Sequence, residues 1–440
     1  MAVPVPAPVP DTTKRAKHER VVLVVLVVAY ASVYLCRANV EPAFNILSAR
    51  HGYDNERIGL VFALALGAYA IGKIVLGTIG DAVGGKKILL FAMVSSVVAT
   101  LLMAAVDWPL VVGATSALWV IGGLVVLNRF AQSGGWGGVV HVVAQWFPAE
   151  RRGAVMGIVS TSFDVGNVVA LLLCSGLVAL DAGWRALFVV PAILLAIAAA
   201  IVLVALRERP SSDGDRDPGT TDRGDEPPID DESLRDTLKR LVRVPELWTA
   251  VLQSFLLTFA RAGFMTWTPK FLYDVSVAAG STSALSGSIS KSAFFGVAGM
   301  TGSLVVGRLS DRAGPGKRAG VMAASLACLL VAVLALAHAP VHDPLAVAVV
   351  IGIAGFFLLG PYSLLGGAIT LDVAGKRGAA TTVGVIDGVG YLGASLSAAV
   401  LGSVSKRAGW SRAFEVLAAV VAIALVVAVG WWRRGRKMTP

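Results

Sequence analysis

Apolar residues fill most of the chain in long runs that short polar segments separate. Each run has 18 residues or more, enough for a helix to cross a hydrocarbon core of ~30 Å. Runs of this length and uniformity indicate membrane-spanning helices rather than strands or the helices of a soluble core. The pattern therefore predicts an all-α membrane protein with twelve spans. They are expected at 21–44, 57–79, 88–106, 117–147, 153–179, 185–206, 246–273, 287–309, 317–338, 344–371, 377–403 and 410–432.

Composition agrees with this pattern. The 440 residues are 56% hydrophobic and only 15% charged, with a mean hydropathy of +0.75. A soluble chain of this size would need much more charge on its surface. The three cysteines, Cys36, Cys174 and Cys328, all fall in apolar spans. Their odd number and position favour small buried hydrophobic residues over a disulfide framework or a metal site.

The net charge of +10 comes mainly from Lys and Arg residues on one side of the predicted membrane. Twelve spans place both termini on one side, where about 26 Lys and Arg residues fall, against about 7 on the other. This asymmetry predicts cytoplasmic termini, and the high Ala, Val and Gly content is compatible with a bacterial cytoplasmic membrane. The basic balance then reflects topology in a lipid bilayer, and we expect no nucleic-acid partner.

A polar segment separates the first six predicted spans from the last six. Residues 207–232 contain ten acidic residues and four prolines with almost nothing apolar, so they cannot bury a core. We expect a disordered N-terminus at 1–20, an N-terminal six-helix bundle at 21–206, a cytoplasmic linker at 207–245, a C-terminal bundle at 246–432 and a basic tail at 433–440.

The two halves repeat each other. LGTIGDAVGGKK matches VGRLSDRAGPGKR, which aligns Gly77 with Gly307 and Asp81 with Asp311. Parallel six-helix repeats that rock around a central site are characteristic of the major facilitator superfamily, which the chain resembles from end to end. The repeated Gly-x-x-x-Asp loops are that superfamily's most recognisable motif. We expect them to act in gating and packing, with the glycines allowing close helix contact.

Ionisable residues inside the spans are the best guide to a site, because each costs at least ~2.5–3.5 kcal/mol in lipid unless it faces protein or water. Arg37 and Arg261 occupy corresponding places in the first span of each half, and an arginine fork matches phosphate or carboxylate oxygens. We predict that both contact an anionic substrate; ion pairs with Asp164 or Asp387 are the alternative.

Other ionisable residues lie in the spans, and positive charge exceeds negative. Lys73 is a second candidate for substrate contact, or a lysine that snorkels to the membrane surface. Arg129 is a third candidate for substrate contact; the alternative is that it forms an ion pair with Asp164. Tyr34 shares a helical face with Arg37 and offers it a hydroxyl. Asp164 and Asp387 are candidates for proton or ion coupling.

Several motifs make the resemblance more specific, because they match one family within this superfamily. YLCRAN at 34–39, KIVLGTIGD at 73–81, ARAGFMTWTPKFL at 260–272 and GYLGASLSA at 390–398 are similar to the organophosphate:phosphate antiporters. The resemblance implies that Arg37 and Arg261 bind the phosphoryl group and that Lys73 assists.

Two departures from this family affect the substrate. Ala38 stands where the glycerol-phosphate branch has lysine, and Asp164 lies where that branch has a substrate-binding histidine. The resemblance therefore supports an anionic, phosphorylated or carboxylated substrate without specifying glycerol-3-phosphate.

These observations lead to one main hypothesis, a monomeric secondary transporter that exchanges an organophosphate for inorganic phosphate by alternating access. The runner-up is a proton-coupled symporter of a carboxylate or other organic anion that uses Asp164 or Asp387. A transporter-like membrane sensor is a minor alternative. The sequence shows no metal cluster, nucleophile elbow or phosphate-binding Gly-Lys-Ser/Thr loop, so we expect neither a cofactor nor an enzyme.

Overall fold

The structure is a computed structural model, and all regular structure in the residues it describes is helical. It describes residues 12–106, 113–147, 149–210, 244–314, 317–338, 343–365 and 370–438.

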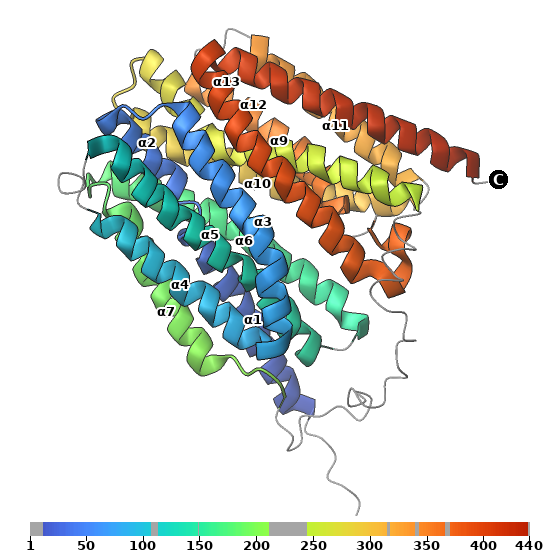
Figure 1. Cartoon of the computed structure of the whole chain (residues 1–440). Helices are drawn as coiled ribbons and strands as arrows, with labels where there is room; N and C mark the ends of the chain where they lie inside the picture. The colour runs from blue at the N-terminus through green and yellow to red at the C-terminus, as the bar shows by residue number, and fades with distance from the viewer. Residues whose placement is uncertain are drawn as a thin grey trace, which may run out of the picture.

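The helices form two groups that lie side by side, coloured blue to green and yellow to red in Figure 1. Most of the expected linker, residues 211–243, lies outside the described ranges. The first group contains α1 (Thr12–Leu35), α2 (Val40–His51), α3 (Asn55–Val83), α4 (Gly85–Ala105), α5 (Gly113–Trp146), α6 (Ala149–Ala179) and α7 (Ala186–Ala205). The second contains α9 (Pro245–Ala278), α10 (Ala284–Ala313), α11 (Arg318–His338), α12 (Pro344–Leu364) and α13 (Thr370–Met438).

Helix lengths match a bilayer. The 21 residues of α4 rise about 31 Å, close to the thickness of the hydrocarbon core. The 69 residues of α13 would reach about 100 Å if straight, but the chain turns back at Gly409, where φ is 82°. The two legs of α13 are visible in Figure 1. With α1 and α2 taken as one broken crossing, the described residues give twelve crossings in two bundles, and the predicted fold class is confirmed.

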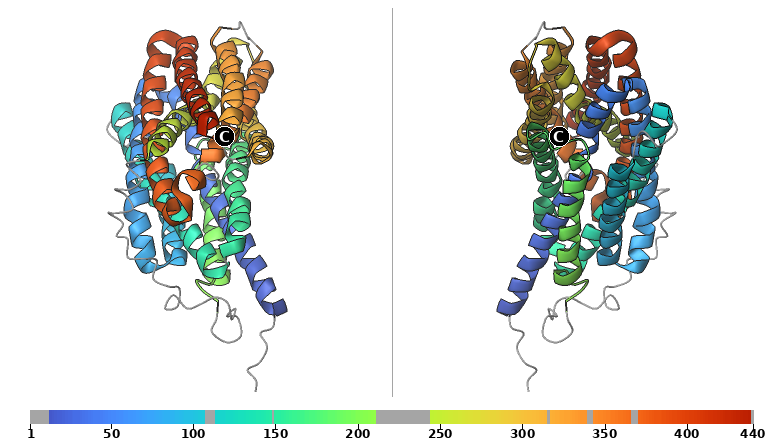
Figure 2. Two further views of the ribbon diagram at one scale, coloured as in Figure 1. Left: turned by 90° about the vertical axis from the view of Figure 1, so that its right-hand side faces the viewer. Right: turned by 90° about the vertical axis from the view of Figure 1, so that its left-hand side faces the viewer.

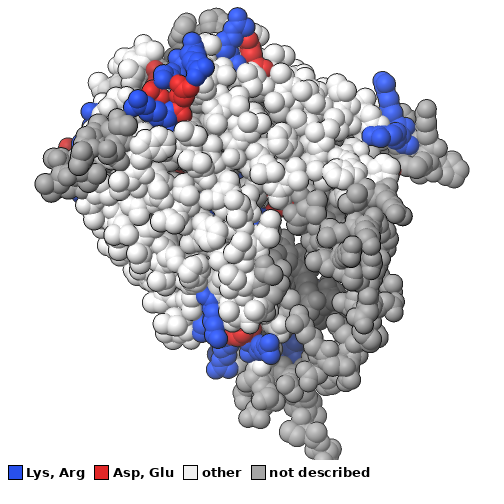
Figure 3. All heavy atoms as spheres, viewed as in Figure 1, with Lys and Arg blue, Asp and Glu red and all other residues white. Residues whose placement is uncertain are grey.

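The outer surface is one that lipid can cover. Ten stretches of the described residues are long and apolar enough to span a membrane. Large apolar side chains face outward along them, as at Val204 and Val426, which are 86% and 71% exposed. On the face in Figure 3 the charged residues gather near the ends and leave a broad uncharged band between them. The protein is therefore a multi-pass membrane protein.

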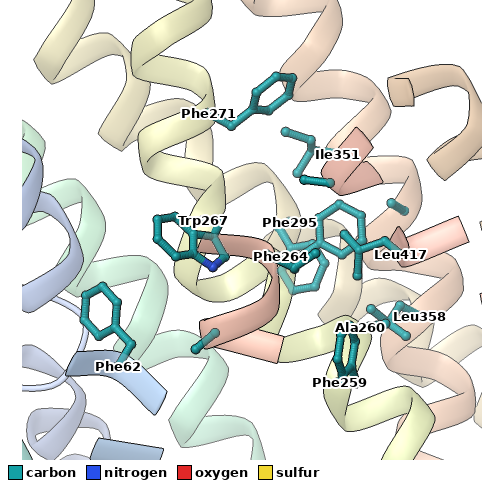
Figure 4. Packing of buried hydrophobic residues seen from close by; sticks show 14 of the residues in the cluster. Phe62, Phe259, Ala260, Phe264, Trp267, Phe271, Phe295, Ile351, Leu358 and Leu417 are labelled. Carbon is teal, nitrogen blue, oxygen red and sulfur yellow. The ribbon is translucent and has the colours of Figure 1, made fainter. Parts of the chain in front are cut away.

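Aromatic and branched side chains fill the interior of the second group and continue into the first. Phe264 of α9 stacks on Phe295 of α10 with ring centroids 5.3 Å apart. Trp267, one turn further along α9, meets Phe62 of α3 edge-on at 6.5 Å (Figure 4). The two groups thus share one apolar core, which sets the position of α9 against α3.

The first turns of α1 and the last turns of α13 lie at one end of the bundle, which we call the terminal end (Figure 1). Figure 2 shows the first turns of α1 projecting from it. We call the opposite end, which carries α2 and the turn at Gly409, the far end; it lies at the upper left of Figure 1. There α3 and the first leg of α13 approach closely. A Cβ atom on Gly402 would lie 2.4 Å from the Asn55 carbonyl oxygen, and one on Gly59 would lie 2.6 Å from that of Ala398. Only glycine allows this contact.

Four charged side chains join the two groups at the far end, and we call them the far-end latch: Asp54, Glu56, Lys406 and Arg407. Lys406 Nζ lies 3.1 Å from Asp54 Oδ2 and 3.0 Å from Glu56 Oε2, and Arg407 also bonds Glu56. Asp54 in addition caps α3 by accepting a hydrogen bond from the Arg57 N–H at 2.9 Å. Such networks hold two elements together better than isolated surface pairs.

The repeated loops at the terminal end show a different arrangement from the one expected. A Cβ atom added to Gly77 or Gly307 would meet no atom of the described residues within 4 Å, so neither glycine shows the expected close contact with that part of the chain. The side chains of Asp81 and Asp311 lie outside the described part of the chain. Among the described residues, the bonds between α3 and α13 run from the far end only as far as Lys73 and Asp387.

Candidate functional site

The first membrane crossing breaks at Arg37. Helix α1 ends at Leu35 and α2 begins at Val40, with a tight turn between them. Within the turn, the N–H groups of Arg37 and Ala38 both bond to the Tyr34 carbonyl, at 3.1 and 2.9 Å. A break inside a membrane leaves backbone carbonyls without helical partners, and they must find other donors.

Helix α5 supplies these donors from successive turns. Asn128 Nδ2 and Gln132 Nε2 donate to the Cys36 carbonyl at 3.0 and 3.2 Å. Arg129 Nη2 donates to the Arg37 carbonyl at 2.9 Å. The side-chain amides of Asn128 and Gln132 thus bind the backbone at the break. Their observed role is to hold the break, and with it the backbone of Arg37.

Two aromatic rings hold the Arg37 guanidinium. Its central carbon lies 4.4 Å from the Tyr69 ring centroid and 5.1 Å from that of Tyr34. Contacts of this kind are worth ~0.5–2 kcal/mol each, and Tyr69 also forms a side-chain hydrogen bond with Arg37. No carboxylate of the described residues lies within 4.0 Å of it, so the expected alternative, an ion pair with Asp164 or Asp387, is absent there.

Arg261 is held in the same way in the second group. Its guanidinium lies 4.8 Å from the Tyr362 ring of α12 and 5.4 Å from the Phe163 ring of α6. Its Nε is buried and has no hydrogen-bond partner, and no described carboxylate lies within 4.0 Å. Phe163 also packs on Tyr34 at 6.2 Å, so a continuous row of side chains connects the two arginines.

A cavity of about 80 Å³ lies between the two groups, several times the space that one water molecule needs. Both arginines line it, together with Arg129 and Tyr34, so four of the predicted substrate-binding residues meet in one place. Glu41 is the acidic residue among those that line the cavity. Its other polar lining residues are Asn167, Thr258, Thr266, Thr268, Ser292 and Tyr391.

Glu41 was missed by the sequence analysis, and it is the partner of Arg129. Glu41 Oε1 lies 3.2 Å from Arg129 Nη2, and the two side chains are 14% and 6% exposed. The expected competing partner, Asp164, is not the one that the structure shows. The signal was present in the sequence, since Glu41 is an acidic residue inside the first apolar run.

Lys73 lies next to the cavity but not on its lining. It forms an ion pair with Asp387 of α13, across the interface between the two groups. Its ammonium lies 4.8 Å from the Tyr391 ring, and Tyr391 in turn packs on Tyr69 at 4.8 Å. Lys73 and Asp387 were expected in separate roles, and the structure brings them together as one pair beside the site.

Asp164 follows Phe163 on α6 and is half-buried. It interacts electrostatically with Arg261, but within the described residues it forms no hydrogen bond or ion pair. It is also absent from the cavity lining. The described residues contain no group of three His, Cys, Asp or Glu side chains that could hold a metal ion.

The charges of the site leave a cationic excess. Arg129 is neutralised by Glu41 and Lys73 by Asp387, whereas Arg37 and Arg261 have no carboxylate of the described residues in contact. Both guanidiniums line a cavity with low-dielectric walls, where an anion is attracted more strongly than in water. The arrangement is suited to bind a doubly charged anion between the two groups of helices.

Comparison with known proteins is consistent with this geometry. The Major Facilitator Superfamily pattern matches residues 26–398 and, in a second match, 292–439. The chain is 26% identical to the glycerol-3-phosphate transporter of Bacillus subtilis (strain 168), over 97% of this chain and 96% of that one. It is also 26% identical to a Chlamydia pneumoniae protein named "Probable hexose phosphate transport protein", over 97% and 94%.

The solved structures similar to this chain include a bacterial homologue of the human lysosomal transporter Spinster, in an inward-facing and unoccupied conformation. Its TM-score is 0.74 at 17% identity, over 95% of this chain and 97% of that one. The nucleoside transporter NupG has a TM-score of 0.70 at 14% identity, over 93% and 99%. At these identities the similarity concerns the fold.

Proposed function

Because the chain belongs to the major facilitator superfamily and is therefore a transporter, we propose that it exchanges an organophosphate for inorganic phosphate. One observation carries the proposal: Arg37 and Arg261, one from each group of helices, line a single cavity with no carboxylate in contact among the described residues. A phosphoryl dianion supplies the two negative charges that this pair lacks. The names of the relatives in Bacillus subtilis and Chlamydia pneumoniae agree with this substrate class.

Alternating access follows from how the two groups meet. The latch and the glycine contact hold the far end together, whereas at the terminal end a Cβ atom on Gly77 or Gly307 would meet no atom of the described residues within 4 Å. We infer that the cavity is reached from the terminal end in this conformation, and that this end faces the cytoplasm of a bacterial cell. A bound anion would attract both guanidiniums and draw the groups together there. An empty cationic site resists that closure, which favours exchange over net transport.

Exchange of labelled phosphate tests the proposal. The purified protein is reconstituted into liposomes loaded with inorganic phosphate, and labelled phosphate is added outside. We expect uptake that requires phosphate inside and that glycerol-3-phosphate or hexose phosphates inhibit. If none of these compounds exchanges or competes, the protein does not move organophosphates. Activity at a protein-to-lipid ratio of less than one copy per two vesicles tests whether a monomer is sufficient.

A second candidate is proton-coupled symport of an organic anion through Asp164. It is favoured by one observation, namely that this half-buried carboxyl forms no hydrogen bond or ion pair with the described residues. Symport predicts uptake into empty liposomes that a protonophore abolishes and that Asp164→Asn removes. Exchange that continues without a proton gradient would count against it.

A further inference from the structure

Glu41 is an ionisable group of the cavity that the exchange described above does not use. It lies in the first turn of α2, directly after the break, and it lines the cavity. One carboxyl oxygen accepts the hydrogen bond from Arg129. The other, Oε2, is buried and has no hydrogen-bond partner. Arg129 Nη1 is likewise buried and unpartnered, so this ion pair is only half satisfied.

The surroundings of Glu41 contain few other charges. The groups that act on its carboxyl are Arg129 of α5, the backbone N–H of Glu41 itself and Arg37 of the break, and the Cys174 thiol of α6 lies near enough to be affected by it. Helices α7 and α9 also pack against α2, and neither contributes a group that acts on this carboxyl. The charge state of Glu41 is therefore set by its burial, by its backbone hydrogen bond, by the two arginines and by whatever occupies the cavity.

A carboxylate in this position is sensitive to an anion in the cavity. A buried charge with an unpaired oxygen is costly, and the two nearby guanidiniums offset part of that cost. An anion that binds the arginines adds negative charge beside Glu41 and weakens that compensation. Binding therefore favours the protonated carboxyl, and by linkage the protonated carboxyl favours binding.

We propose that Glu41 is a proton-binding site linked to the anion site, so that the anion and a proton occupy the cavity together. The proposal rests on the proposed function, because it requires an anion bound at Arg37 and Arg261. When the anion enters, an O–H bond forms on the Glu41 carboxylate with a proton from water on the open side. No bond of the substrate breaks, and the proton returns to water when the anion leaves. Arg129 keeps its bond to the Arg37 carbonyl throughout.

Linkage gives this proposal a measurable consequence. Where Glu41 is ionised in the empty protein and protonated in the complex, anion affinity falls as pH rises, by at most about tenfold per pH unit. Inorganic phosphate titrates in the same range and adds its own pH dependence, which is common to every variant. The difference between the wild type and a Glu41 variant therefore isolates the contribution of this carboxyl.

Calorimetry with inorganic phosphate tests the proposal directly. Phosphate is titrated into the purified full-length protein in two buffers of different ionisation enthalpy, which gives the number of protons taken up per anion bound. The wild type should take up more protons than Glu41→Gln, with a difference of up to one. Asp164→Asn is the matched control, because it replaces another carboxyl near the site, and it should behave like the wild type. Equal uptake by the wild type and Glu41→Gln, or uptake lost only in Asp164→Asn, overturns the proposal.

The remaining outcomes are also informative. If Glu41→Gln does not fold, Glu41→Asp replaces it, and it must retain the uptake with a shifted pH midpoint; an unshifted midpoint overturns the proposal. If Glu41 only positions Arg129, Glu41→Gln changes phosphate affinity equally at every pH. If the wild type binds phosphate without extra proton uptake, the proton site is wrong and the proposed function stands. If the wild type binds no phosphate or organophosphate, the proposed function fails first.

Discussion

At the scale of single residues, the site depends on two guanidiniums that aromatic rings hold and no carboxylate contacts. The sequence identified Arg37 and Arg261 because an arginine inside an apolar run is conspicuous. It could not identify Tyr69, Tyr362 or Phe163 as the rings that hold them, because aromatic residues are common in spans and their partners lie on other helices. The sequence alone was enough to locate the two charged side chains. It was not enough to show the aromatic contacts that orient them.

Arg37→Lys and Arg261→Lys should each lower phosphate exchange by on the order of a hundredfold or more. Lysine keeps the charge but loses the planar fork and its contact with the rings. Initial rates in phosphate-loaded liposomes measure the effect. Arg185→Lys is a control at an arginine outside the cavity and should retain exchange. Wild-type rates in both cavity variants would mean that charge alone suffices and that the fork geometry has no role.

Lys73 and Asp387 should stabilise the fold as a pair. Asp387→Asn leaves the Lys73 ammonium without its partner and should cost about 1–3 kcal/mol, less than a fully buried pair because the Asp387 side chain is 37% exposed. The double variant Lys73→Met with Asp387→Asn should regain most of that loss. Melting temperatures in detergent provide the double-mutant cycle. Additive losses would show that the two side chains act independently.

At the scale of elements, the break between α1 and α2 is the feature that the sequence could not show. The apolar run continues through Cys36–Asn39 without glycine or proline, so it looks like one uninterrupted span. The break persists because side chains of α5, about 90 residues later in the chain, bind the carbonyls that it releases. Span positions depend on local hydropathy and were predictable, whereas this turn depends on tertiary partners. The pairing of Lys73 with Asp387, 314 residues apart, is unpredictable for the same reason.

The contact of α3 with α13 gives a prediction with a control on the same helix. Gly402→Ala places a methyl group 2.4 Å from the Asn55 carbonyl and should force the helices apart, which lowers the melting temperature. Gly388→Ala meets no atom within 4 Å, so it should be neutral or stabilise by up to about 1 kcal/mol through the helix propensity of alanine. Equal melting temperatures for the two variants would mean that the close contact does not limit packing.

At the scale of the whole molecule, the two ends differ in how the halves are joined. The far end has the latch and the glycine contact, and among the side chains that the structure describes the bonds between α3 and α13 reach from there to Lys73 and Asp387. The repeat in the sequence predicted two similar halves but not which end is closed. That choice depends on side chains such as Glu56 and Lys406, which come from opposite halves and have no counterparts in the repeated motifs.

The latch should control how often the far end opens, and it should do so without responding to pH in the transport range. Burial opposes ionisation of Asp54, but hydrogen bonds from the Arg57 N–H and from Lys406 outweigh it, so the pKa of Asp54 is lowered. A carboxyl with a lowered pKa contributes stability that is complete above its ordinary value of about 3.9 and is lost as pH falls through the lowered one. Between pH 5 and 8 the contribution of Asp54 should therefore be constant.

Distances across the far end test this prediction. Spin labels at Ala182→Cys and Ser281→Cys, both exposed, report on the two halves in a background without the native cysteines. The wild type should give one short distance from pH 5 to 8, and Glu56→Gln with Lys406→Met should add a longer one. The same variant should raise exchange only if opening of the far end limits turnover. An unchanged distance distribution would show that the glycine contact and the apolar core close this end without the ion pairs. A distribution that shifts between pH 5 and 8 would show that a group other than Asp54 controls it.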